Sequence, residues 1–216
     1  MIPLSNVFHG RGAACCALFL GILILVALIL SGLAPFDRTT WLLEVSPVLI
    51  ALPVLALTHS RFPLTSLMYS LIFAHALVLI LGGAYSYARV PLGFWIRDAL
   101  SLDRNPYDKI GHFMQGFVPA LLMRELVIRL GVVRGQRWVT AICVMAAMTL
   151  SALYELFEWG SAVVLGQGAE EFLGTQGDPW DTQSDMLCAL IGACSALAFL
   201  SGMHDRQLGK MTGSIR

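Results

Sequence analysis

Residues 13–34 read AACCALFLGILILVALILSGLA, an apolar stretch without one charged side chain. A helix needs about 20 such residues to cross the hydrocarbon core of a bilayer. The apolar run is longer than that of a secretory signal peptide, and no small-x-small cleavage site follows it. We therefore expect a retained membrane helix. The whole chain agrees, because 57% of its 216 residues are hydrophobic, 13% are charged, and the mean hydropathy is +0.73.

Further apolar segments predict an all-α polytopic membrane helix bundle with about six transmembrane helices in a single domain, residues 1–216. The expected spans are 13–34, 41–58, 63–83, 109–130, 138–165 and 183–203. Pro47 and Pro53 interrupt the second span, and we expect that helix to be kinked. An even number of spans places both termini on one side of the membrane.

The distribution of basic residues predicts which side that is. The expected loops on the terminal side hold more basic residues, namely Arg11, Arg61, Arg129, Arg134, Arg137, Arg206, Lys210 and Arg216, against Arg38, Arg89, Arg97, Arg104 and Lys109. This bias predicts cytoplasmic termini. The long loops 84–108 and 166–182 then lie outside, together with Asp37, Glu44, Asp98, Asp103, Asp108, Glu170, Glu171, Asp178 and Asp181.

Composition also argues against several classes of partner and site. Fourteen basic and fourteen acidic residues balance, so no net charge suggests binding to nucleic acid. The five cysteines lie in apolar stretches without Cys-x-x-Cys spacing, which supports neither a zinc knuckle nor a disulfide framework.

Three expected helices carry paired ionisable residues near the same, outer interface. Each pair is three or four residues apart and so shares a helix face. The pairs are Asp108 with His112, Glu155 with Glu158, and Asp181 with Asp185. The rise of 1.5 Å per residue brings the middle pair close to the depth of the other two.

Glu155 and Glu158 are the hardest of these residues to explain by solvation alone, because apolar residues flank them. A carboxylate in hydrocarbon costs roughly 2.5 to 3.5 kcal/mol even on the permissive insertion scale. A shared proton, a cationic partner such as Lys109, or a bound metal ion would relieve their repulsion. One imidazole with several carboxylates suits Mg, Mn, Fe or Zn. The candidate metal ligands are His112, Glu155, Glu158, Asp181 and Asp185.

Other polar residues within the expected spans have simpler interpretations. Arg124, Glu125 and Arg129 are expected to form an ion pair at the cytoplasmic interface with extended arginine side chains. His75 is expected to be a hydrogen-bonded histidine inside the bundle, and His204 is expected to lie in a loop or terminus.

The second half of the chain resembles the YjdF family of bacterial inner-membrane proteins. The resemblance rests on Tyr107-Asp108-Lys109-x-x-His112-Phe113, on Tyr154-Glu155-x-x-Glu158-Trp159, and on the segment from Phe172 to Met186. A more remote similarity, with Gly192 as the later glycine, is to the VanZ-like membrane proteins, which often have an asparagine where this chain has Ala189. The YjdF resemblance implies a multi-pass protein of the bacterial inner membrane and no particular reaction.

Three functions stay open at this point. The first is a membrane enzyme acting on a lipid or lipid-linked substrate, with His112, Asp108, Glu155 and Glu158 as catalytic residues and a divalent metal as a possible cofactor. The second is a small proton- or cation-coupled transporter. The third is a structural or stress-related membrane protein without catalysis. The sequence indicates the lipid bilayer as surroundings and names neither a substrate nor an oligomeric state.

Overall fold

The computed structural model describes residues 4–165 and 175–212, and all regular structure within these ranges is helical. This confirms the all-α prediction. The helices are α1 (Leu4–Leu33), α2 (Arg38–Thr58), α3 (Ser66–Tyr85), the short 3-10 helix η1 (Tyr87–Arg89), α4 (Pro91–Leu100), α5 (Tyr107–Leu130), α6 (Gln136–Leu165) and α8 (Asp181–Thr212).

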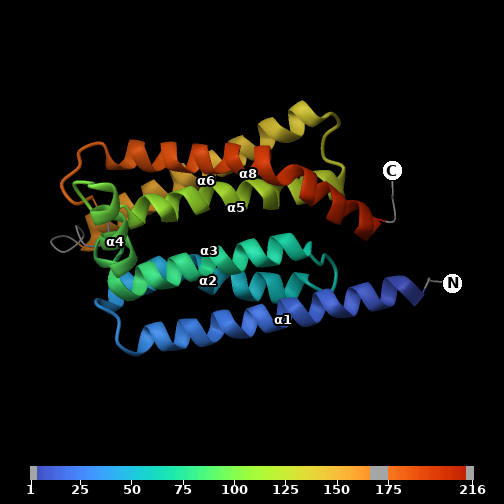
Figure 1. Ribbon diagram of the computed structural model, residues 1–216, viewed down its shortest axis with the longest axis horizontal. Coiled ribbons are helices and arrows are strands. Elements are labelled where there is room, and N and C mark those ends of the chain that lie inside the picture. The colour runs from blue at the N-terminus through green and yellow to red at the C-terminus, as the bar shows by residue number, and fades with distance from the viewer. Residues whose placement is uncertain (1–3, 166–174, 213–216) are drawn as a thin grey trace.

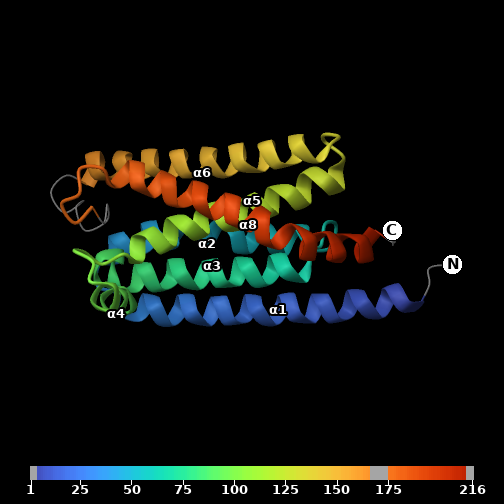
Figure 2. The same cartoon turned by 45° about the horizontal axis from the view of Figure 1, so that its top comes forward.

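The long helices lie side by side along the long axis of the molecule, as Figure 1 shows. The first residues of α1 and the last residues of α8 lie at the same end, here called the terminal end. The short helix α4 lies at the opposite end, here called the α4 end. In the turned view of Figure 2, α6 and α1 lie on opposite sides of the bundle, with α5 and α3 between them. Helix α5 packs against α8, α6 and α3, which makes it the centre of the fold.

Five of the described helices are long and apolar enough to cross a membrane, in segments within α1, α2, α3, α6 and α8. Helix α5, the expected fourth span, is not among them. Its position explains this difference, because a helix surrounded by other helices can carry polar side chains that a lipid-facing helix cannot. The count of six spans and the cytoplasmic placement of the termini stay predictions.

Local caps set several helix boundaries. Asp37 Oδ1 accepts a hydrogen bond of 2.7 Å from the backbone N–H of Thr40 and so caps α2. This bond lowers the pKa of Asp37. Gly131 ends α5 in the left-handed conformation, at φ +64°. Both prolines of α2 lie inside one continuous helix.

Small residues bring the backbones of α5 and α8 into close contact. A Cβ atom added at Gly116 would overlap the carbonyl group of Ala189, and one added at Gly192 would overlap the carbonyl oxygen of Phe113. Such small residues are typical of tightly packed membrane helices. The contact fixes α8 against α5 and places Asp185 next to the first turns of α5.

The structure corrects one sequence interpretation at the terminal end and adds detail to another. Helix α8 continues nine residues past the expected end of the last span, so His204 is helical and buried and does not lie in a loop. Arg124 and Glu125 are also buried within the bundle, and the predicted ion pair of Glu125 with Arg129 is present at 2.9 Å. Each of these side chains reaches an oppositely charged or hydrogen-bonding partner inside the bundle, which allows them to be buried.

At the α4 end, the expected loop 84–108 contains η1 and α4. Glu170, Glu171 and the family-like residues 172–174 lie outside the described residues.

Candidate functional site

His112 lies at the centre of a buried group of carboxylates at the α4 end of the bundle. Its Nε2 atom is 3.5 Å from Asp108 Oδ1 and 3.9 Å from Asp185 Oδ2, and its Nδ1 atom is 3.6 Å from Glu155 Oε1. Nδ1 also lies 3.1 Å from Gln115 Oε1. Helices α5, α6 and α8 therefore bring their ionisable residues together. We call His112, Asp108, Glu155, Glu158 and Asp185 the histidine cluster.

Two basic side chains neutralise the acidic residues of α8. Lys109 Nζ is 2.8 Å from Asp181 Oδ1 and 2.6 Å from Asp185 Oδ1. Arg104 binds Asp181 Oδ1 at 2.7 Å and Asp178 Oδ2 at 2.9 Å. Partial burial works against the charged form of Arg104, but its hydrogen bond to Asp181 and the charges nearby raise its pKa overall. Lys109 is thus a cationic partner, as one of the sequence alternatives suggested, but for α8 and not for the glutamates of α6.

The remaining carboxylates of the histidine cluster are incompletely bonded. Asp108 is 7% exposed and Glu155 is 8% exposed, yet Asp108 Oδ2 and Glu155 Oε1 have no hydrogen-bond partner. Glu158 is buried beside them. A buried polar atom without a partner is unfavourable, and like charges close together add repulsion. The arrangement therefore needs shared protons or additional positive charge to be stable.

The atoms of the histidine cluster are close enough to hold a metal ion. One ligand atom from each of His112, Glu155 and Glu158 lies within 4.8 Å of the others, and the same is true of Asp108, His112 and Asp185. The first group is more available, because Asp185 is already held by Lys109. Asp181, a predicted ligand, belongs to neither of these groups among the described residues, and both of its basic partners contact its Oδ1 atom.

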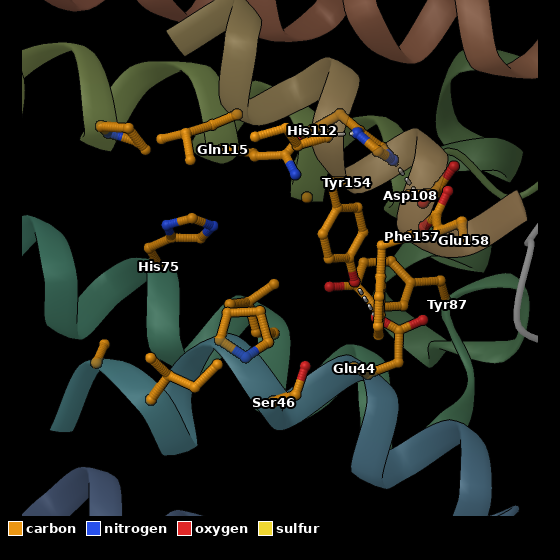
Figure 3. A pocket seen from close by; sticks show the side chains of 18 of the residues that line it. Glu44, Ser46, His75, Tyr87, Asp108, His112, Gln115, Tyr154, Phe157 and Glu158 are labelled. Carbon is orange, nitrogen blue, oxygen red and sulfur yellow. Dashed lines mark hydrogen bonds and ion pairs between the residues drawn. The ribbon is translucent and has the colours of Figure 1, made fainter. Parts of the chain in front are cut away.

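A cavity of about 550 Å³ adjoins the histidine cluster. It lies between α2, α3, α5 and α6, and Figure 3 shows its polar end at Glu44, Tyr87, Asp108 and Glu158, with His75 on the far side. The other lining residues are mostly apolar, among them Pro47, Ile50, Ala51, Val54, Leu79, Pro119, Leu150, Leu153 and Phe157. An apolar cavity with a few convergent polar groups is typical of a small-molecule site.

The structure adds Glu44 and Tyr87 to the residues expected at this site. Glu44 is buried in α2 and accepts a 3.1 Å hydrogen bond from the Tyr154 hydroxyl group of α6 (Figure 3). Its position three residues inside the expected second span could have identified it. Tyr87 follows α3 and is also buried, and burial raises its pKa well above the usual value, so its side chain is a neutral phenol. No sequence pattern marked Tyr87.

A second charged cluster lies near the terminal end. Glu125 accepts hydrogen bonds from the backbone N–H and hydroxyl group of Thr65, and it lies 2.9 Å from Arg129 Nη1 and 3.0 Å from His204 Nε2. Arg124 contacts His204 Nδ1 and binds Asp205 at 2.7 Å. We call these residues the Glu125 cluster. It joins the N-terminus of α3 to α5 and α8.

Comparison with known proteins gives the family. Residues 16–206 match the family described as "Predicted membrane protein (DUF2238)". The chain is 53% identical over 189 residues to "Inner membrane protein YjdF" of Escherichia coli (strain K12), covering 86% of this chain and 90% of the relative. No solved structure matches the chain. The VanZ-like similarity has no support among these matches. The matches extend the YjdF resemblance into the first helix and confirm a multi-pass protein of the inner membrane, so the chain belongs to the DUF2238 family of membrane proteins.

Proposed function

We propose that the protein is a membrane enzyme that binds a divalent metal ion in the histidine cluster and acts on a lipid or lipid-linked substrate at the outer interface. One observation carries the proposal: buried carboxylate oxygens without a hydrogen-bond partner surround a histidine that lines an apolar cavity. An intramembrane cluster of this kind is unfavourable on its own and is a functional site by default.

The ligand set suits a hard or borderline metal ion. His112, Glu155 and Glu158 offer one imidazole and two carboxylates, which is the ligand chemistry of Mn, Fe and Zn sites. A bound divalent ion would neutralise the carboxylates and lower the pKa of a water molecule. Asp108 lies 3.5 Å from the imidazole ring and would orient it. Lys109 holds Asp185 in place on the other side.

The transporter alternative has less support from the cavity. A proton path needs a chain of titratable groups across the membrane, and intramembrane ionisable residues mark such paths. Beyond Gln115 and His75, however, the cavity lining is apolar, and it does not include the residues of the Glu125 cluster.

Metal analysis of the purified protein tests the proposal. We expect a stoichiometric amount of Mn, Fe or Zn in the wild-type protein, and a loss of most of it in His112→Ala and Glu158→Ala. Asp98→Ala is the matched control, because Asp98 lies in α4 and is paired with Arg97 at the surface. Equal and negligible metal in all four proteins, before and after incubation with each ion, would rule out the metal-dependent enzyme.

A further inference from the structure

The lining of the cavity shows how a ligand could reach it. Helix α2 packs against α3, whereas α6 packs against α5 and α8, and α2 and α6 form no extensive packing interface over their described residues. Between them lie apolar lining residues that are strongly exposed: Ile50 at 65%, Val54 at 52% and Leu153 at 56%. Exposed apolar residues of a membrane helix face lipid chains. The cavity therefore has a mouth that opens sideways into the bilayer.

The two sides of the cavity differ in chemistry. The cluster side carries the carboxylates of Glu44 and Asp108, and Asp108 Oδ2 has no partner. The far side is apolar except for His75, whose Nε2 atom is also unpartnered, and Gln115 (Figure 3). An occupant that complements both sides needs a hydrocarbon chain and a positively charged group at one end.

We propose that this cavity binds a phospholipid with a cationic amine in its headgroup, which enters between α2 and α6. One acyl chain lies along Ile50, Ala51 and Val54 toward His75, and the ammonium group lies near Asp108 and Glu44. The hydrogen bond from Tyr154 to Glu44 joins α6 to α2 beside the headgroup end. This inference gives the substrate class of the proposed enzyme. Only the lipid's role as a substrate rests on the proposed function.

Charge explains why an amine is preferred to an anionic headgroup. Lys109 and Arg104 are occupied by the aspartates of α8, so neither is available to a phosphate group at the cavity. An anionic headgroup without an amine would add negative charge beside Asp108, whose Oδ2 atom has no hydrogen-bond partner. An acyl chain that moves from the bilayer into an apolar cavity exchanges one apolar environment for another. The headgroup therefore decides which lipid the cavity selects.

Photocrosslinking in bilayers tests the inference. The metal-free protein is reconstituted in membranes of an uncharged glycosyldiacylglycerol with a small fraction of phosphatidylethanolamine or phosphatidylglycerol carrying a diazirine in one acyl chain. We expect label on the cavity-lining residues His75 and Gln115, at least several-fold stronger for phosphatidylethanolamine. Asp108→Asn should remove that preference while keeping some label.

A pair of matched variants shows whether the label comes from the cavity. Ala51→Trp fills the lining and should abolish labelling of His75 and Gln115, whereas Ala74→Trp, on an exposed site of α3 outside the lining, should leave it unchanged. Thermal unfolding confirms that both variants are folded. Equal labelling by the two lipids overturns headgroup recognition, and so does stronger labelling by a diazirine polyprenyl phosphate.

The crosslinking and the metal analysis fail independently. Absent label at His75 and Gln115 overturns the lipid site even when the purified protein holds metal. Selective labelling of a protein that binds no metal would support the lipid site and contradict only the proposed metal-dependent enzyme.

Discussion

The chain carries two buried charged clusters near opposite ends of α5, and their carboxylates differ in how completely they are hydrogen-bonded. Both oxygens of Glu125 accept hydrogen bonds, and its side chain is fully buried. In the histidine cluster, one oxygen each of Asp108 and Glu155 has no partner. A buried carboxylate with all its bonds made fixes a structure, whereas one with an unbonded oxygen lacks a component. The contrast concerns the carboxylates, because Arg124 Nε of the Glu125 cluster also has no hydrogen-bond partner. We infer that the Glu125 cluster holds helices together and that the histidine cluster binds a ligand.

The same substitution, glutamate to glutamine, made in each cluster tests this comparison, and the largest effect is expected at Glu125. Glu125→Gln removes the negative charge that faces His204 and Arg129, and its amide nitrogen cannot accept the hydrogen bonds made to the oxygen that it replaces. We expect the unfolding free energy to fall by about 3 to 5 kcal/mol, the usual result of removing one partner of a buried ion pair. Reversible unfolding in mixed micelles measures it.

A matched control lies in the same cluster. Asp205 binds Arg124, but its side chain is 58% exposed. Arg124 itself is buried, but asparagine keeps an oxygen that can accept its hydrogen bond, so Asp205→Asn should lower the unfolding free energy by only about 1 kcal/mol. A small loss in Glu125→Gln, similar to that of the control, would show that the Glu125 cluster does not hold the helices together.

An intermediate effect on stability is expected for Lys109, which holds Asp185 of the histidine cluster. Lys109→Met leaves Asp185 with only the 3.9 Å contact to His112 Nε2, while Asp181 keeps Arg104. Hydrogen bonds to charged groups contribute about 1.5 to 3 kcal/mol, and we expect a loss of unfolding free energy in that range. Lys109→Arg keeps the charge and should recover most of it. An unchanged stability in Lys109→Met would mean that Asp185 is balanced by another group.

The two clusters also show how far sequence reasoning reaches. Spacing predicted that Asp108, His112, Glu155 and Glu158 face one region, because helix periodicity and the expected depth are local properties. The partners of Glu125 were not predictable in this way, since His204 lies 79 positions away and its helix extends beyond the apolar segment. Hydropathy marks where lipid surrounds a helix, and it does not register helical turns whose polar residues are paired inside the bundle.

Helix α2 shows the same limit at the site itself. Glu44 joins the cavity because Tyr154 of α6 donates a hydrogen bond to it, across a sequence separation of 110 residues. Hydropathy predicted a membrane span here, and α2 is a helix long and apolar enough to be one, but hydropathy did not show which helix α2 would face. The cavity between them depends on tertiary packing that no single span encodes.

The smallest effect on stability is expected for Glu155→Gln, the counterpart of the change at Glu125. Glu155 Oε1 accepts no hydrogen bond and lies 3.6 Å from His112 Nδ1, so glutamine loses one long ionic contact, is relieved of repulsion from the nearby carboxylates and keeps nearly the same volume. In metal-free protein we expect the unfolding free energy to change by less than about 1 kcal/mol. Added metal should then raise the thermal unfolding temperature of the wild-type protein and leave that of the variant unchanged, because a ligand that binds only the folded state stabilises it. A metal-free loss as large as that of Glu125→Gln would make the histidine cluster structural as well, and the two clusters would no longer differ in kind.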